Sequence, residues 1–112
     1  MRRATVALAA WLSVAAGCAG TDPSPQKLYQ AFCARCHGKS GEGDGKSLQL
    51  YPGLDLRRSP MIRSGDREAV RRRIAEGEGP MPGFIHRLSP AQIEALVELS
   101  LRFSSQDPAT IP

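Results

Sequence analysis

The stretch Cys33-Ala34-Arg35-Cys36-His37 decides how the rest of this 112-residue chain is interpreted. Two cysteines three positions apart lie on one face of a helix, so both thiols can react with one flat ligand. The imidazole of the next residue can then reach the centre of that ligand. A C-x-x-C-H arrangement is the attachment signature of a c-type haem. We therefore predict that Cys33 and Cys36 form the thioether bonds and that His37 is the proximal ligand of the iron.

The two cysteines alone also allow other interpretations. A C-x-x-C pair can be a structural disulfide, half of a zinc site or a thioredoxin-like redox pair. A redox pair of that kind follows a strand in a βαβ context, and a zinc site needs a second pair of ligands. The sequence has neither pattern. A histidine directly after the second cysteine, downstream of an export signal, favours haem attachment.

The first residues predict export from the cytoplasm. Met1-Arg2-Arg3 is a short basic start, and an apolar run over residues 4–16 follows it. This run is too short to span a bilayer. A basic start with a short apolar run is typical of a secretory signal peptide, which we place at residues 1–17.

The end of the signal resembles the lipobox of bacterial lipoproteins, in which cleavage precedes a cysteine that is then lipidated. Residues 14–18 read Val-Ala-Ala-Gly-Cys, with Ala15 where that family usually has Leu. The alternative is ordinary cleavage after Ala19, because small residues flank Cys18 in an A-x-A-like site. We expect lipidation of Cys18, since it is otherwise an odd thiol in an oxidising compartment. More than one acyl chain gives stable anchoring, so the expected location is periplasmic and bound to a membrane.

The net charge of the chain favours no particular charged partner. The full chain has 15 basic and 11 acidic side chains, and removal of Arg2 and Arg3 with the signal leaves 13 against 11. Two ionised haem propionates would roughly cancel this excess. Net charge therefore indicates neither a nucleic-acid partner nor an acidic substrate. Arg57 and Arg58 are candidates for contact with a propionate, but we expect them to face water.

A first helix is predicted to begin at Gln26, after a short tether over residues 18–25. The tether is small, polar and proline-containing. From Gln26 onward, apolar residues recur at intervals of three or four, which is typical of an amphipathic helix. Gly38 is expected to end this helix, directly after His37. The apolar stripe consists of Leu28, Tyr29, Phe32, Cys33 and Cys36.

Residues 38–65 show no sustained helix or strand period, and glycines and prolines interrupt them. A structureless loop of this length is uncommon in a small domain. A haem removes the difficulty, because scattered apolar residues can pack on the porphyrin and glycines let the backbone approach it. A flexible, disordered loop is the alternative. The apolar anchors are Leu48, Leu50, Leu54, Leu56 and Ile62.

A second helix is predicted from Asp66, as N-cap, to Gly77, which ends it. Its few apolar residues indicate a narrow buried edge. The arginines at 67 and 71–73 either form a solvated face or steer an acidic partner.

A last helix is predicted after Ser89-Pro90-Ala91-Gln92. This stretch combines an N-cap, a proline in the first turn and a capping-box glutamine. A broad apolar face then runs from Ile93 to Phe103. We expect residues 104–112, which are polar and proline-bearing, to form a flexible tail.

The stretch Gly79-Pro80-Met81-Pro82-Gly83-Phe84 is the second informative motif. Two prolines place Met81 in a stiff turn that cannot continue a helix. Stiffness suits a weak thioether ligand, which must be presented at a fixed distance from the iron. We therefore expect Met81 as the distal ligand. Ordinary core filling is its alternative role, and Met61 and His86 are the alternative ligands.

Five stretches within residues 26–103 together form a recognisable set of motifs. They are Leu28-Tyr29, Cys33-x-x-Cys36-His37-Gly38, Gly41-x-Gly43-Asp44-Gly45, the Gly79–Phe84 stretch and the helix that Ser89 begins. Together they resemble a monohaem class I cytochrome c, over most of the chain that follows the signal. The resemblance implies an all-α fold, with about three to four helices and long loops wrapped around one covalent haem c. It also implies thioethers at Cys33 and Cys36, with His37 and Met81 as the axial ligands.

One part of the sequence departs from this family. The family often has Gly early in the first helix, packed against an aromatic residue of the last helix. Pro25 and Gln26 occupy the first region here, and Leu99 stands where the aromatic is common. We expect the contact between these helices to be looser or to use Phe32 and Phe103.

The expected function is one-electron transfer outside the cytoplasm, between partner proteins such as a dehydrogenase, an oxidase or a reductase. With both axial positions filled, the iron changes oxidation state without gaining or losing a ligand. We therefore expect no catalytic residue and no small-molecule substrate. Two other functions stay open: a haem c subunit of a larger oxidoreductase, and an enzyme or gas sensor whose iron has an open sixth position.

Overall fold

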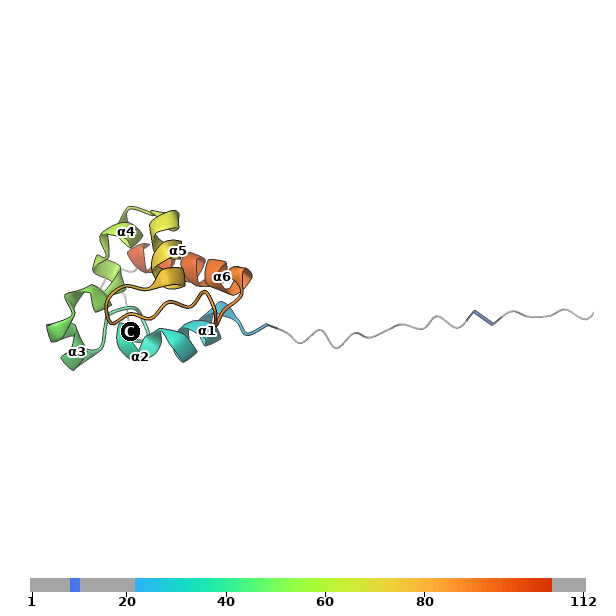
Figure 1. Ribbon diagram of the computed structural model, residues 1–112, viewed down its shortest axis with the longest axis horizontal. Coiled ribbons are helices and arrows are strands. Elements are labelled where there is room, and N and C mark those ends of the chain that lie inside the picture. The colour runs from blue at the N-terminus through green and yellow to red at the C-terminus, as the bar shows by residue number, and fades with distance from the viewer. Residues whose placement is uncertain (1–8, 11–21, 106–112) are drawn as a thin grey trace, which may run out of the picture.

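Helices make up almost all of the regular structure in the computed structural model, which describes residues 9–10 and 22–105. Within these ranges the only strand-like feature is a bridge between Glu78 and Met81. The predicted all-α fold is confirmed (Figure 1). The α-helices are α1 (Pro25–Phe32), α2 (Ala34–His37), α3 (Gly45–Leu50), α4 (Pro60–Arg63), α5 (Arg67–Glu76) and α6 (Pro90–Leu101). The 3-10 helices are η1 (Pro52–Leu54), η2 (Leu56–Arg58) and η3 (Arg102–Ser105).

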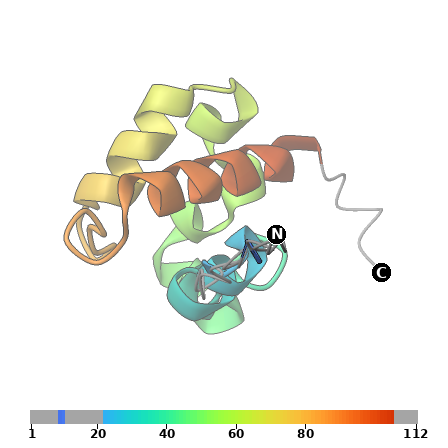
Figure 2. The ribbon, with the colours of Figure 1, turned by 90° about the vertical axis from the view of Figure 1, so that its right-hand side faces the viewer.

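Helix α6 packs against α5 on one side and α1 on the other (Figure 2). It carries the two most deeply buried side chains of the described residues, Leu96 and Val97. Ser89 caps the helix as predicted: its hydroxyl accepts the N–H of Gln92, and the Gln92 side chain accepts the N–H of Ser89. The rest of the core consists of Leu28, Tyr29, Ile62, Val70, Ile74, Phe84, Leu88, Ile93 and Phe103.

The predicted first helix is divided into two. Helix α1 begins at Pro25, one residue earlier than expected, because Ser24 provides an N-cap. At Cys33 the backbone leaves the helical region, with φ at −120°, and the chain resumes as α2. Gly38 ends α2 with φ at 78°, as predicted. The two cysteines therefore lie at the junction of α1 and α2 and within α2.

Aromatic rings join α1 to the C-terminal end of the fold. The ring centroids of Tyr29 and Phe103 are 5.4 Å apart. The prediction that Phe103 serves this contact is confirmed, but Phe32 packs instead against Phe84, at 5.7 Å. Tyr29 is also fixed next to Phe103 by its hydroxyl, which donates a 2.6 Å hydrogen bond to the carbonyl of Gly38.

Residues 38–65 are more regular than predicted. Elements α3, η1, η2 and α4 fall in this segment, which is why the described residues contain six α-helices rather than three to four. Each of these elements is only three to six residues long. Such short elements contain too few turns to produce a periodic apolar pattern.

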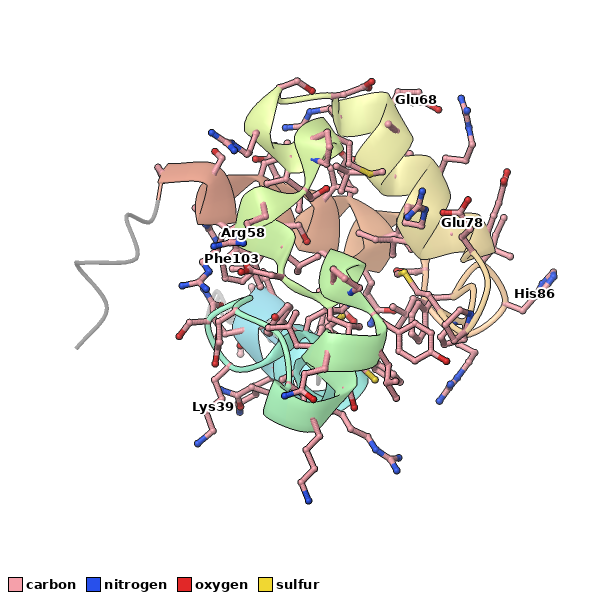
Figure 3. The ribbon with its side chains drawn as sticks, turned by 90° about the vertical axis from the view of Figure 1, so that its left-hand side faces the viewer. Lys39, Arg58, Glu68, Glu78, His86 and Phe103 are labelled. Atoms are coloured by element: carbon pink, nitrogen blue, oxygen red, sulfur yellow. The ribbon has the colours of Figure 1, made fainter. Side chains whose placement is uncertain are left out.

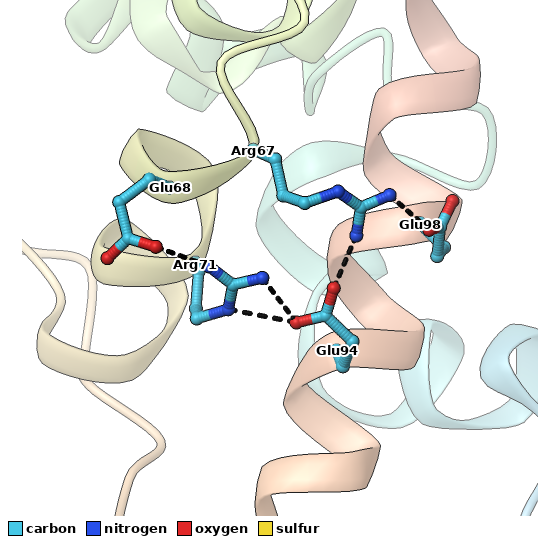
Figure 4. A network of polar contacts seen from close by, with 5 residues as sticks. All are labelled: Arg67, Glu68, Arg71, Glu94 and Glu98. Atoms are coloured by element: carbon cyan, nitrogen blue, oxygen red, sulfur yellow. Dashed lines mark hydrogen bonds and ion pairs between the residues drawn. The ribbon is translucent and has the colours of Figure 1, made fainter.

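Ion pairs tie α5 to α6 (Figure 4). These side chains are at least one-third exposed, so each pair stabilises the fold only slightly. Hydrogen bonds from Arg71 hold the pKa of Glu94 below its usual range, with Arg67 acting in the same direction. The arginine run is therefore largely neutralised, which favours the solvated face over a steering role. The pairs between the two helices are Arg67–Glu94, Arg67–Glu98 and Arg71–Glu94, and Arg71 also pairs with Glu68 within α5.

Asp66 and Gly77 begin and end α5 as predicted. After Gly77, residues 77–85 fold back against the end of this helix, and we call them the Met81 loop. The N–H of Phe84 donates to the carbonyl of Ile74 at 3.0 Å, and the N–H of Ile85 donates to that of Ala75 at 3.1 Å. These bonds satisfy carbonyls that the end of a helix leaves unpaired.

Two glycines make this close approach possible. A Cβ at Gly83 would lie 2.6 Å from the carbonyl oxygens of Ala75 and Glu76. A Cβ at Gly77 would lie 2.3 Å from the carbonyl oxygen of Met81, and Gly77 also has a φ of 72°. The path of the Met81 loop therefore depends on the absence of side chains at residues 77 and 83.

Gly83→Ala should lower the free energy of unfolding by about 1–3 kcal/mol, because the new methyl group is forced into backbone of α5. Urea unfolding of the holoprotein measures this. Gly45→Ala is the matched control, since a Cβ there meets nothing within 4 Å. Equal stability of the two variants would show that the loop does not pack against α5 in this way.

Candidate functional site

A cavity of about 520 Å³ lies among α2, the α3–α4 segment, α5 and the Met81 loop. Its volume falls within the range of about 300–1,000 Å³ that is typical of small-molecule and cofactor sites. Cys33, Cys36 and His37 line it together with Met61 and Met81. Most of the other lining residues are apolar: Tyr29, Phe32, Leu50, Tyr51, Pro52, Leu54, Leu56, Ile62, Val70, Ile74, Pro80, Pro82 and Phe84.

A hydrogen bond orients the imidazole of His37. Its Nδ1 lies 2.8 Å from the carbonyl oxygen of Leu54, in η1. A carbonyl only accepts hydrogen bonds, so Nδ1 carries the proton and Nε2 keeps a free lone pair. Metal-ligating histidines are commonly oriented in this way. This partner could not be predicted from the sequence, because a backbone carbonyl has no residue signature.

Backbone and side-chain hydrogen bonds hold residues 33–37, the haem peptide, in place. The N–H of Gly43 donates to the carbonyl of His37 at 2.7 Å, and the N–H of Asp44 donates to that of Cys36 at 3.1 Å. Burial raises the pKa of Tyr29 far above its usual range, so its hydroxyl stays neutral and keeps donating to Gly38.

The environment of the two cysteines does not fit the alternative sites. Burial raises the pKa of the Cys33 thiol to about 11, with a smaller contribution from Cys36. Thioredoxin-like pairs have a lowered thiol pKa instead. No disulfide joins Cys33 to Cys36 in the described part of the chain. Among the described residues no group of three or more His, Cys, Asp and Glu side chains could hold a metal ion, which counts against a zinc site there.

The structure separates the three candidates for the second axial position. Met61 and Met81 both line the cavity and are partly buried. His86 is exposed, is absent from the cavity lining and points away from the body of the protein (Figure 3). His86 is therefore not brought together with His37. The two methionines lie in different kinds of backbone. Met81 lies in the Met81 loop, whereas Met61 lies in the single turn of α4.

The predicted apolar anchors are brought to the cavity, with one exception. Leu50, Leu54, Leu56 and Ile62 line it, although Leu50 is 76% exposed. Leu48 instead lies beside Gly43, where a Cβ would come within 2.8 Å of its side chain.

A buried carboxylate near the site was missed by the sequence analysis. Asp55 is only 6% exposed. Its oxygens accept hydrogen bonds from the guanidinium of Arg57 at 3.0 and 3.1 Å, which hold the pKa of Asp55 below its usual range. The expectation that Arg57 faces water is therefore wrong, because it pairs with Asp55. Arg58, whose side chain is 85% exposed, does face water.

Cys18 and most of the predicted signal peptide lie outside the described residues. In the part of the chain that the structure describes, no helix has the length and apolar character needed to cross a membrane.

Residues 20–99 match the family described as cytochrome C oxidase, cbb3-type, subunit III. The chain is 38% identical to cytochrome c6 of Gloeothece citriformis over 87 residues, covering 75% of this chain and 71% of the relative. It is 30% identical to cytochrome c6 of a Synechococcus species over 102 residues, covering 91% and 87%.

A third relative is a much longer protein. The chain is 32% identical over 90 residues to the cbb3-type cytochrome c oxidase subunit FixP of Azorhizobium caulinodans. The match covers 75% of this chain but only 29% of FixP.

The cavity suits the cofactor that this family carries. Two cysteine sulfurs and one oriented imidazole lie in a cavity with a mostly apolar lining, which fits the covalent attachment of one haem. The comparisons and the donor set agree. The chain therefore belongs to the cytochrome c family, as a monohaem class I cytochrome c that transfers electrons through one covalently bound haem c.

Proposed function

We propose that this protein carries single electrons between redox partner proteins, with thioethers at Cys33 and Cys36 and with His37 and Met81 as axial ligands. The haem supplies the ferric–ferrous couple. The observation that supports the proposal is that these four side chains line one cavity. They come from the two halves of the chain, and the fold brings them to the same cavity.

His37 is suited to the proximal position by its hydrogen bond to Leu54. This bond fixes the ring orientation and the tautomer, and it leaves the lone pair of Nε2 available to the iron. The imidazole needs no reorientation when the iron changes its oxidation state.

Met81 is favoured over Met61 by the way the backbone holds it. The N–H of Met81 donates to the carbonyl of Glu78, and the N–H of Glu78 donates to that of Met81, each at 3.0 Å. Pro80 and Pro82 restrict the backbone on both sides. A thioether is a weak ligand, so a rigid loop that presents it at a fixed distance is an advantage.

A filled sixth position also explains why we propose a carrier rather than an enzyme. A Met/His pair leaves no open coordination site for a substrate and raises the potential relative to a bis-His pair. His86, the one other histidine of the chain, is exposed and lies outside the cavity. It is therefore not placed to act in acid–base chemistry at the iron.

The axial ligand can be tested with the absorption spectrum of the oxidised holoprotein. We expect the weak band at the red edge that marks sulfur bound to ferric iron. The band should disappear in Met81→Ala, because the thioether is lost, and should persist in Met61→Ala and His86→Ala.

Loss of the band in Met61→Ala alone would assign the ligand to Met61. A low-spin spectrum without the band, altered by His86→Ala, would indicate a bis-His site. Either result would contradict the proposed ligand pair.

We also propose that the protein works outside the cytoplasm and is anchored to a membrane through Cys18. Support comes from the basic start, the short apolar run and the lipobox-like residues 14–18. Lipid chains on Cys18 would hold the haem domain near membrane-bound partners, on a tether over residues 18–25.

Cys18→Ser should release the protein from the membrane fraction, because the acceptor of the lipid is lost. The mass of the mature N-terminal peptide in the wild type provides the direct measurement. We expect cleavage before Cys18 and the mass of attached acyl chains. An unmodified peptide that begins after Ala19 would show that the signal is an ordinary one.

A second candidate function is a haem c subunit of a larger oxidoreductase, which the similarity to part of FixP favours. The two functions differ in native mass. A free carrier solubilised in detergent should migrate at the size of one chain, about 12.1 kDa before processing. Stable co-purification with an oxidase would favour the subunit.

A further inference from the structure

An ion pair that has no role in the proposed electron transfer lies in the cavity lining with Met81. Arg73, in the last turn of α5, contacts Glu78 in the Met81 loop. Both side chains line the cavity together with Met81. In Figure 3, Glu78 lies where α5 runs into the loop. Within the described residues, His37 is the one other Asp, Glu, Lys, Arg or His side chain in that lining.

The backbone couples Glu78 directly to Met81. Their two main-chain groups exchange both hydrogen bonds, each at 3.0 Å, and they form the single bridge of the described residues. Glu78 therefore cannot move away from the cavity without moving Met81 or breaking both bonds.

The far end of the Met81 loop is already fixed. Phe84 and Ile85 donate to carbonyls of α5, and Phe84 is buried against Phe32. Between the two ends, Pro80 and Pro82 have no N–H to donate. In the described part of the chain, the Arg73–Glu78 contact is the ion pair that fastens the near end of the loop to α5.

We propose that Arg73 and Glu78 are positioning residues. Their ion pair holds the Met81 loop closed and so sets how often the sixth position of the iron opens to external ligands. This inference rests on the proposed role of Met81 as the distal ligand.

The effect should be small and measurable. The side chains of Arg73 and Glu78 are 39% and 67% exposed. Loss of an exposed pair should therefore raise the open fraction by roughly two- to five-fold. A ligand that binds only the open form gains apparent affinity by the same factor.

Imidazole binding to the ferric holoprotein measures this opening, under mildly alkaline conditions where imidazole is neutral. The variants are Glu78→Gln, Arg73→Gln and the double variant. We expect each single change to lower the dissociation constant of imidazole by roughly two- to five-fold. The double variant should match the single ones, because the same contact is lost only once.

The two single changes alter charge in opposite directions, which separates a loop effect from an electrostatic one. If charge alone acted, the two dissociation constants would shift oppositely and the double variant would return to the wild-type value. Glu76→Gln and Arg72→Gln are matched controls on α5, at exposed residues with no recorded ion pair in the described part of the chain. They should leave the imidazole affinity unchanged.

Urea unfolding of the same variants separates positioning from general stability. Because the contact is absent from the open and the unfolded forms alike, the free energy of unfolding should fall by no more than the free-energy equivalent of the affinity change. The inference is overturned if the single variants keep the wild-type imidazole affinity or shift it in opposite directions. It is also overturned if the control variants change the affinity equally.

The red-edge band distinguishes this failure from failure of the proposed function. A wild-type band that disappears in Met81→Ala, together with unchanged imidazole affinity in Glu78→Gln, would overturn only the role of the ion pair. Absence of the band in the wild type, or its persistence in Met81→Ala, would overturn the Met81 assignment and the inference with it.

Discussion

The hydrogen bond between His37 Nδ1 and the carbonyl oxygen of Leu54 is the contact on which the site depends. It joins the haem peptide to a residue 17 positions downstream. Because Nδ1 is paired with the carbonyl of Leu54, Nε2 is the ring nitrogen left to bind a metal ion. Leu54 and the nearby Leu56 also line the cavity. One contact thus orients His37, the proposed proximal ligand, and brings up part of the apolar lining, so the short helices between residues 45 and 63 help to build the site.

Local signals predicted the frame of this structure well. The Ser89 capping box, the Asp66 N-cap and the glycines at 38 and 77 act through neighbouring backbone, and each lies where the sequence placed it. Spacing alone also predicted that Cys33, Cys36 and His37 hold the haem, and these three side chains line one cavity. Signals of this kind need no knowledge of the tertiary fold.

The remaining features arise from contacts between distant residues. The break at Cys33 divides one periodic pattern into two helices, and Tyr29 rather than Phe32 packs on Phe103. A residue pattern shows which side chains are apolar, but not which of two neighbours on one face meets a given ring. A different reason applies to the pairing of Asp55 with Arg57 and of Arg73 with Glu78. These partners are close in the sequence, but charged residues are usually solvated, and no residue pattern distinguishes a paired charge from a solvated one.

We propose that both axial positions are filled from within the chain, so that the protein passes electrons without binding a substrate. Titration of the reduced holoprotein with carbon monoxide tests this most directly, because carbon monoxide needs an open position on ferrous iron. For the wild type, we expect a low-spin spectrum that carbon monoxide leaves unchanged. For Met81→Ala, we expect carbon monoxide to bind. Tight binding of carbon monoxide to the wild type, together with a high-spin spectrum, would contradict this proposal and indicate ligand chemistry at an open iron.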